Sequence, residues 1–464
     1  MFKRYIGDRA FYRRVLGVAV PIIIQNGISN FVSMLDNIMV GRVGTVEMSG
    51  VAIVNQLMFV FNLCVFGAVS GAGIFTAQFH GNGDHEGVRH TFRFKFIISF
   101  LLGALGICLF RFAGEPLIRL YLKGEGDAHD AALSLAHGLS YLQVMLLGLL
   151  PFALANAYSS TLRETGQTVV PMVAGITAVF VNLGLNYVLI FDHFGTPAMG
   201  VRGAAWATVI SRYVELAVVA GWTHFHGEKN PFIRGTYKSL YIPGKLLKGI
   251  VVKGMPLLIN EFLWASGMAI MNQCYSVRGL DVVAAQNISS TLWNLASVVF
   301  LSMGNAVGII IGQMLGAGLS EAEVRDADRK LVALSVASCL IFGALMAAVS
   351  GLFPRIYNTT DSVRSLAMRF ICVGAVIMPF NAYTNAAYFT LRSGGQTMVT
   401  FLFDSCFVWV CCVPIAFCLS RFTDMPIVPL YAICQATDLI KCVIGGRMIH
   451  KGAWIQNLAK TAEN

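Results

Sequence analysis

Charged side chains are scarce in this sequence. Only 12% of its 464 residues are Asp, Glu, Lys or Arg, whereas 56% are hydrophobic. Soluble domains carry about 25% charged residues, so the composition excludes an ordinary soluble domain and indicates an integral membrane protein. The net charge of +10 does not indicate nucleic-acid binding, because the positive residues stand at the ends of apolar runs and form no basic patch on a soluble face.

Several catalytic and energy-coupling motifs are missing too. The chain has no GxxxxGK[ST] loop and no soluble region large enough for a nucleotide-binding domain, which argues against transport driven by ATP. It shows no spacing typical of a nucleophile–base pair, so we expect neither an enzyme nor a bound cofactor. None of its eleven cysteines falls in metal-ligand spacing, and we interpret them as small buried hydrophobic residues.

Long apolar runs fill most of the chain. A membrane-spanning helix needs about 20 mostly apolar residues, and we find twelve candidates. They lie near residues 15–40, 50–73, 92–112, 133–157, 168–191, 201–224, 250–275, 283–311, 330–352, 366–390, 397–419 and 427–447. The predicted fold class is therefore an all-α integral membrane protein with twelve transmembrane helices.

The distribution of positive charge predicts the orientation. Because the number of spans is even, both termini lie on the same side of the membrane. Lys and Arg number 23 on the termini and even-numbered loops but only 10 on the odd-numbered loops. The positive-inside rule places the richer side in the cytoplasm. We therefore expect both termini and the long 225–249 loop to be cytoplasmic.

The chain repeats itself at a distance of about half its length. At a shift of 235 residues, Pro21 matches Pro256. At a shift of 229, LRETGQT (162–168) overlays LRSGGQT (391–397). Such self-similarity indicates a duplicated architecture.

The 225–249 loop separates the two copies. We therefore predict an N-terminal lobe over residues 1–235 (helices 1–6) and a C-terminal lobe over 236–464 (helices 7–12). Six helices per copy keep the same orientation in both, so the repeats are parallel and related by an axis along the membrane normal, as in some secondary transporters.

Two Gly-rich segments, HGNGD (80–84) and GAGLS (316–320), occupy equivalent positions in the repeat. A phosphate-binding loop would need a motif that neither segment has. Helix C-caps, where Gly accepts a positive φ, explain both copies at once.

One carboxylate, Asp36, interrupts the first apolar run. A charge at membrane depth costs roughly 2.5–3.5 kcal/mol on insertion scales, so it commonly marks an ion or substrate path. In the fifth span, Asn182 and Asn186 are four residues apart and share a helix face, and Asn156 ends the fourth span. Their oxygens with Asp36 suit a hard cation. Alternatively, Asp36 carries a proton or only hydrogen-bonds a neighbouring helix.

The second half has acids of its own. Glu261 lies near the middle of its span, and Asn272 shares its helix face. In the repeat alignment Asp36 overlays Met271, so Asp36 and Glu261 are not copies of one site. They differ in depth by roughly 15 Å, which suggests ion coupling in one half and either cationic-substrate binding or a second ion in the other. Asp404 is a third candidate, for the same cavity or for a structural pair.

Two prolines and two charge pairs complete the candidates. Pro21 and Pro256 lie inside helices, where they kink the chain and free backbone carbonyls, so we expect them to act as hinges. Paired charges at i, i+3 spacing are more often structural than catalytic. Such pairs are Arg212 with Glu215 and Asp438 with Lys441.

Together these features resemble the multidrug and toxic compound extrusion (MATE) transporters. The resemblance covers nearly the whole chain. It rests on the twelve spans in two parallel halves and on four segments: PIIIQNGISNFVSMLDNIMVGRVG (21–44), LRETGQT (162–168), VNLGLNYVLIF (181–191) and GVRGAAWATVISR (200–212). It implies a V-shaped pair of six-helix lobes around a central cavity. It also implies export of amphiphilic, often cationic compounds, driven by inward Na⁺ or H⁺.

Carried over by position, the resemblance implies a cation-coupling site in the first lobe. Its residues would be Asp36, Asn156, Asn182, Asn186 and Thr208. If the ion is Na⁺, Asp36 and Asn182 are the expected metal ligands. Some members have a second acid in helix 5, where this sequence has Asn186, so one formal charge remains.

The resemblance also concerns an acidic site in the second lobe, which would be incomplete here. The acid of helix 7 is similar to Glu261, whereas helix 10 offers Asn381 and Asn385 in place of the usual acidic partner. Together with the residues singled out from the sequence itself, the expected residues of a substrate cavity are Glu261, Asn272, Asn385 and Asp404.

The leading expectation is a secondary multidrug exporter of a bacterial cytoplasmic (inner) membrane. Its partners would be small amphiphilic or cationic substrates and the lipid bilayer, with no nucleic acid, and we expect a monomer. The alternative is a flippase-type exporter of lipid-linked saccharides on the same fold. Those substrates carry phosphates and call for a cationic cavity, whereas Asp36 and Glu261 are acidic.

Overall fold

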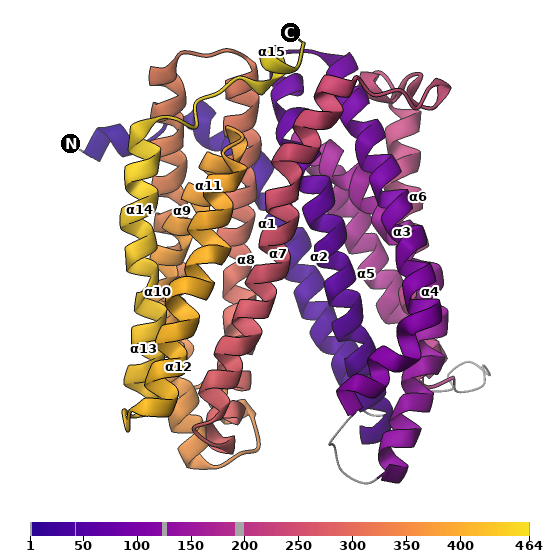
Figure 1. Ribbon diagram of the computed structural model, residues 1–464, viewed down its shortest axis with the longest axis vertical. Helices are drawn as coiled ribbons and strands as arrows, with labels where there is room; N and C mark the ends of the chain where they lie inside the picture. Colours follow the sequence, from indigo (N-terminus) through magenta and orange to yellow (C-terminus); the bar gives the residue numbers. More distant parts are fainter. Residues whose placement is uncertain (1, 42, 123–127, 191–198, 464) are drawn as a thin grey trace. The chain divides into compact units, whose positions relative to one another are not determined.

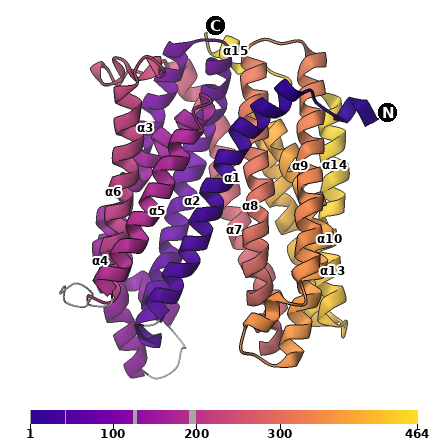
Figure 2. The same cartoon turned by 180° about the vertical axis from the view of Figure 1, so that it is seen from behind.

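The computed structural model describes residues 2–41, 43–122, 128–190 and 199–463. All regular elements within these ranges are helical (Figures 1 and 2). The first half contains α1 (Arg9–Gly41), α2 (Thr45–Gly81), α3 (His85–Leu122), α4 (Ala128–Glu164), α5 (Val169–Ile190) and α6 (Val201–Phe225). The second contains α7 (Gly244–Ser276), α8 (Leu280–Gly316), α9 (Glu321–Val349), α10 (Asp361–Ser393), α11 (Thr397–Phe401), α12 (Val413–Phe422), α13 (Ile427–Ala436), α14 (Asp438–Lys451) and α15 (Leu458–Glu463).

Short elements connect these helices. Four are 3-10 turns: η1 (Phe2–Tyr5), η2 (Pro231–Ile233), η3 (Thr236–Lys238) and η4 (Phe353–Ile356). Two π-helical turns, η5 (Leu402–Cys406) and η6 (Val408–Cys412), join α11 to α12. The predicted eleventh span is therefore one continuous helical segment with a widened middle.

The fold class predicted from sequence is confirmed. Within the described residues, eleven helical segments are long and apolar enough to cross a membrane. Of the twelve predicted spans, the seventh is the one outside this set, although α7 is a continuous helix of 33 residues. Three residues of low hydropathy, Pro256, Asn260 and Glu261, lie within the most apolar stretch of α7 and therefore lower its mean hydropathy.

The chain forms two compact units. Unit 1 comprises Met1–Ile23, Ala77–Gly83 and Gly249–Asn464, and unit 2 comprises Ile24–Thr76 and Asp84–Lys248. Helix α1 thus passes from unit 1 to unit 2 shortly after Pro21. The lobe boundary between residues 235 and 236 and the hinge role of Pro21 stay predictions.

The duplicated sequence produces duplicated helix ends. Gly83 and Gly318 have φ angles of 75° and 69°, and Gly166 and Gly395 have φ angles of 84° and 76°. A residue with a Cβ rarely adopts these left-handed φ values, whereas Gly does so without strain. The predicted C-caps at the two Gly-rich segments are confirmed, and the LRETGQT and LRSGGQT segments end their helices in the same way.

Unit 1 contains a reciprocal contact between the ends of α2 and α8. A side chain at Gly81 would overlap the backbone of Gln313, and one at Gly316 would overlap the backbone of Gln78. These two glycines are equivalent in the repeat, as are the two glutamines. The helices approach this closely because Gly lacks a Cβ, so backbone contacts backbone on both sides.

Gln78 also holds the C-terminal segment of unit 1. Its buried amide donates to the carbonyl of Ser393 at 2.9 Å and accepts from the N–H of Leu458 at 2.6 Å. Trp454, in the same segment, is fully buried, and its carbonyl lies where a side chain at Gly394 would be. One side chain therefore joins α2, the end of α10 and the C-terminal segment.

We expect Gln78→Ala to release the C-terminal segment. The substitution leaves a buried carbonyl and a buried N–H without their partner, at about 1–3 kcal/mol for each group. Limited trypsinolysis should then cut faster at Lys451 and Lys460, and thermal stability should fall. Gln273→Ala, at an exposed position on α7, is the control and should change neither measurement. Unchanged cleavage in Gln78→Ala would contradict the conclusion that Gln78 holds the C-terminal segment.

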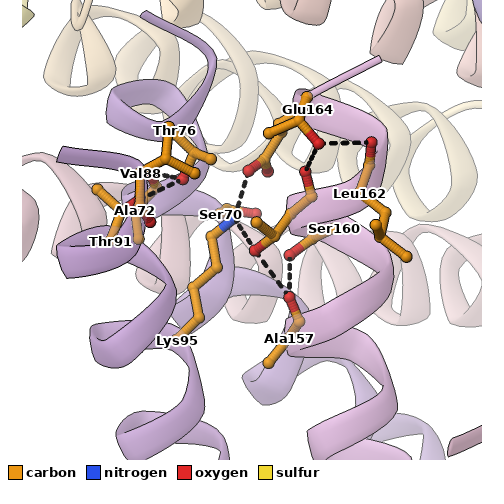
Figure 3. A network of polar contacts seen from close by, with 12 residues as sticks. Ser70, Ala72, Thr76, Val88, Thr91, Lys95, Ala157, Ser160, Leu162 and Glu164 are labelled. Atoms are coloured by element: carbon orange, nitrogen blue, oxygen red, sulfur yellow. Dashed lines mark hydrogen bonds and ion pairs between the residues drawn. The ribbon is translucent and has the colours of Figure 1, made fainter. Parts of the chain in front are cut away.

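Unit 2 is held together by an apolar core and a buried polar network. The network joins α2, α3 and α4 (Figure 3). In it, the fully buried ammonium of Lys95 pairs with the Glu164 carboxylate and donates to Thr161 Oγ1 at 3.2 Å. Thr76 Oγ1 donates to Thr91 Oγ1 at 2.9 Å in the same network. Such a pair is stable only while both partners are present.

Candidate functional site

The carboxylate of Asp36 lies in unit 2 between α1 and α5. Asn186 donates from Nδ2 to Asp36 Oδ1 at 2.8 Å and to Asn182 Oδ1 at 3.1 Å. Asn182 and Asn186 are only 6% and 1% exposed, so water competes little for these contacts. The i, i+4 spacing predicted from sequence therefore places both amides on the face of α5 that meets Asp36.

The amide of Asn182 can face the carboxylate in two ways. In one orientation its nitrogen lies 3.0 Å from Oδ1 and 2.9 Å from Oδ2 of Asp36, and its oxygen accepts from the N–H of Thr208 at 3.3 Å. In the opposite orientation Nδ2 donates to Thr208 Oγ1 at 3.3 Å, and the oxygen faces the carboxylate and accepts the bond from Asn186 Nδ2. An ionised carboxylate needs the N–H, whereas a protonated or cation-bound carboxylate is compatible with the oxygen.

Two further side chains, Arg212 and Tyr141, interact electrostatically with Asp36. Arg212, on α6, acts electrostatically on Asp36, and its guanidinium stacks 4.5 Å above the ring of Phe152. Tyr141, on α4, donates to Asn55 Oδ1 at 3.3 Å. The predicted Arg212–Glu215 pair is present at 3.7 Å. The sequence identified neither Tyr141 nor Asn55, because neither breaks an apolar run with a charge.

The structure brings together four of the five predicted coupling residues. Asp36, Asn182, Asn186 and Thr208 form one connected set. Asn156 is half-buried on α4 and, among the described residues, makes no hydrogen bond to that set. The roles of all five stay predictions.

The equivalent position in unit 1 is apolar. The repeat places Met271 at the position of Asp36, and Cys411 and Ile415 at those of Asn182 and Asn186. Met271 is buried in a hydrophobic cluster against which Cys411 and Ile415 pack. The carboxylate–amide arrangement of unit 2 is therefore not repeated at this position.

Unit 1 instead buries an ion-pair cluster around Asp404. Lys441 contacts Asp404 Oδ1 at 3.3 Å and Asp438 Oδ1 at 3.9 Å, and Asn260 Nδ2 donates to Asp404 Oδ2 at 3.1 Å. Glu261 interacts electrostatically with Asp404 and with Arg392. The predicted Asp438–Lys441 pair is thus present, and it includes Asp404 as a second acid.

The four residues predicted to line a substrate cavity do not form a single cluster. Glu261 and Asp404 are neighbours, as described above. Asn272 accepts from Gln286 Nε2 at 2.7 Å, and Asn385 packs against Gly304 of α8. Eleven residues separate Glu261 from Asn272, which corresponds to about 16 Å along α7. Their shared role in substrate binding stays a prediction.

An all-helical membrane fold with one carboxylate held by amides inside a helix bundle is characteristic of an ion-coupled secondary transporter. The sequence model of the MatE family matches residues 21–188 and 256–418. The chain therefore belongs to the MATE family of transporters, which are ion-coupled and are not enzymes.

Curated relatives match along nearly the whole chain. The chain is 24% identical over 472 residues to the probable multidrug resistance protein NorM of Thermotoga maritima, with 100% of this chain and 98% of the relative covered. It is 26% identical over 417 residues to the multidrug resistance protein PmpM of Pseudomonas aeruginosa, with coverage of 89% and 84%.

Solved structures share the fold. A MOP superfamily transporter of Pyrococcus furiosus superposes with a TM-score of 0.83 at 18% identity, covering 97% of this chain and 98% of that chain. A point mutant of the MATE transporter VcmN of Vibrio cholerae superposes with a TM-score of 0.85 at 16% identity and the same coverage. The two-lobe architecture of six helices each is that of the MATE fold.

Proposed function

We propose that this protein exports amphiphilic and cationic compounds from the cell in exchange for an inward-moving Na⁺ or H⁺. The observation that carries the proposal is the Asp36 carboxylate, held by Asn182 and Asn186 inside unit 2. One ionisable group that can bind and release a monovalent cation is what such an exchange requires. The names of the relatives NorM and PmpM support multidrug compounds as the substrates.

The energy available from one ion is sufficient. One monovalent cation entering down 100 mV releases about 2.3 kcal/mol, and a tenfold gradient adds about 1.4 kcal/mol. Together they sustain roughly 500-fold accumulation of a neutral substrate at unit stoichiometry. No second energy source is needed.

Everted membrane vesicles test this function. Export, seen as uptake of a dye into these vesicles, should follow whichever gradient, Na⁺ or pH, drives the protein, when the two are imposed separately. Vesicles without the protein are the control. If the protein moves no dye under either gradient but moves lipid-linked saccharides, the flippase alternative is correct. The pairing of Lys441 and Arg392 with acids in unit 1 argues against the cationic cavity that a phosphate-bearing substrate would need.

The proposed direction of transport requires cytoplasmic termini and a cytoplasmic 225–249 loop in a bacterial inner membrane. The support is the 23-to-10 excess of Lys and Arg on that side. In a cysteine-free background, Cys introduced at exposed Ser239 should react only from the cytoplasm. Cys introduced at exposed Arg119, beyond the apolar part of α3, should react only from outside. The reverse labelling pattern would overturn the orientation.

Glu261 is proposed to attract the cationic part of a substrate. If so, Glu261→Gln should weaken binding of a cationic ligand about 5- to 150-fold, the equivalent of a lost interaction of about 1–3 kcal/mol, and leave a neutral ligand nearly unaffected. Equilibrium binding to purified protein measures both. Glu321→Gln, at an exposed acid on α9, is the control. Equal losses for both ligands would indicate a second coupling site instead.

A further inference from the structure

The connection between α6 and α7 is docked onto α3 within unit 2. Arg93 donates from its guanidinium to the carbonyls of Thr236 at 2.9 Å and of Gly235 and Tyr241 at 3.1 Å each. Arg89 donates to the carbonyl of Phe232 at 3.3 Å. A connection held at four carbonyls has a defined position, so the surfaces that it forms with α3 are defined too.

This docking creates an apolar groove beside α3. The groove has a volume of about 410 Å³. Its lining consists entirely of apolar side chains from α3, the connection and the first turn of α7: Phe94, Ile97, Ile98, Leu101, Leu240, Ile242 and Leu247. Leu101, Leu240 and Leu247 are exposed at its rim, so the groove opens at the protein surface.

The groove continues into the bilayer-facing surface of α3. Its four α3 residues follow i, i+3, i+4, i+7 spacing, and the same stripe continues through Leu105 and Leu109 to Phe112, which is 84% exposed. The run between Arg93 and Arg111 has no charge other than the buried Lys95 and spans about 25 Å of helix, close to the thickness of a hydrocarbon core. Residues 94–101 therefore lie in the half of the core nearest the connection.

Positive charge accompanies the groove-lining residues of the connection and of α7 in the sequence. Lys238, Lys245 and Lys248 are exposed and flank Leu240, Ile242 and Leu247 in sequence. No Asp or Glu occurs between Glu228 and Glu261. Because α7 begins at Gly244, Lys245 and Lys248 lie in its first two turns, two positions before and one position after groove-lining Leu247.

We propose that this groove is a binding site for an anionic phospholipid, with an acyl chain along α3 and the phosphate headgroup near Lys245 and Lys248. Lysines at a membrane surface attract anionic lipids, and an apolar groove open to the bilayer accepts a chain. A cationic amphiphile is disfavoured by the same lysines. The bound lipid contacts both α3 and the connection, so it reinforces the docking made by Arg89 and Arg93.

Fluorescence quenching in the full chain tests the site. Leu240→Trp places a fluorophore at the rim, and Leu105→Trp places one farther along the same α3 stripe as a control for ordinary bilayer contact. Each protein, in mixed lipid–detergent micelles, is titrated with brominated phosphatidylglycerol or brominated phosphatidylcholine. The six native tryptophans are subtracted using the parent protein.

We expect Leu240→Trp to show a strong preference for phosphatidylglycerol and Leu105→Trp to show none. Adding Lys245→Gln and Lys248→Gln should reduce the preference about 30-fold, roughly 5-fold for each lysine, without changing quenching by phosphatidylcholine. Lys451→Gln with Lys460→Gln removes equal charge at exposed positions of unit 1 and should leave the preference intact.

Three results would overturn the proposal. The first is equal quenching of Leu240→Trp by both lipids, which would indicate ordinary bilayer contact. The second is an equal loss of preference in the control pair of lysine variants, which would indicate a general surface potential. The third is displacement of phosphatidylglycerol from the groove by tetraphenylphosphonium, which would indicate a site for cationic compounds.

Discussion

Replacing Asp36 with Asn is expected to abolish ion-driven efflux. The substitution keeps the volume and hydrogen-bonding capacity of the side chain but removes the one formal negative charge among Asp36, Asn182, Asn186 and Thr208. Without it, no cation is bound at this site, and ion-driven accumulation, about 10-fold for a singly charged dye exchanged one for one in a tenfold ion gradient, should fall to the background level. Uptake of a cationic dye into everted vesicles, the direction that corresponds to export from the cell, measures this directly under an imposed gradient.

Two comparisons separate coupling from folding in that experiment. Asp424→Asn makes the same chemical change at an exposed position and should transport normally. Equilibrium dye binding to purified Asp36→Asn should persist, because a folded protein without coupling still binds substrate. Normal dye resistance in cells that express Asp36→Asn at the wild-type level would show that Asp36 has only a structural role.

Breaking the buried pair in unit 2 should have the largest effect on stability. Glu164→Gln leaves the fully buried Lys95 ammonium without its carboxylate partner (Figure 3). Removing one member of a buried pair costs about 3–5 kcal/mol. For a unit of this size, that corresponds to a fall in Tm of about 10 °C, measurable by thermal unfolding of the purified protein in detergent.

The matched variant is the double substitution Lys95→Met with Glu164→Gln. Replacing both members by uncharged side chains removes the uncompensated charge, so most of the lost stability should return. Lys451→Met, at an exposed position, should change stability by less than about 0.5 kcal/mol. A double variant as unstable as the single one would show that the pair is not the source of the effect.

Helix periodicity predicted much of the site in unit 2. The spacing of Asn182 and Asn186 fixed their common face, and Asp36 was conspicuous as a charge within an apolar run. Thr208 came from the resemblance alone, and the structure places it beside Asn182. The contact between α1 and α5 joins residues 150 positions apart, so spacing within one helix could not have established it.

Other features depend on tertiary contacts that the sequence does not display. Asp404 was noticed, but its partner Lys441 lies 37 residues away on another helix. Nothing local identifies Gln78 as the residue that holds the C-terminal segment, because its partners are backbone groups with no side-chain pattern. Asn156 is the converse case, since a polar residue at the end of a span did not bring it into contact with Asp36.

The apolar character of unit 1 at Met271, Cys411 and Ile415 has a physiological consequence. With one carboxylate–amide site, we expect one driving ion per transport cycle. Exchange of that ion for a singly charged drug moves no net charge, so membrane voltage does not assist it. A cell that keeps 100 mV but loses its ion gradient would then still concentrate a neutral drug outside about 50-fold. The same cell could not concentrate a monovalent cation outside at all, because exchange without an ion gradient only equalises its concentration on the two sides.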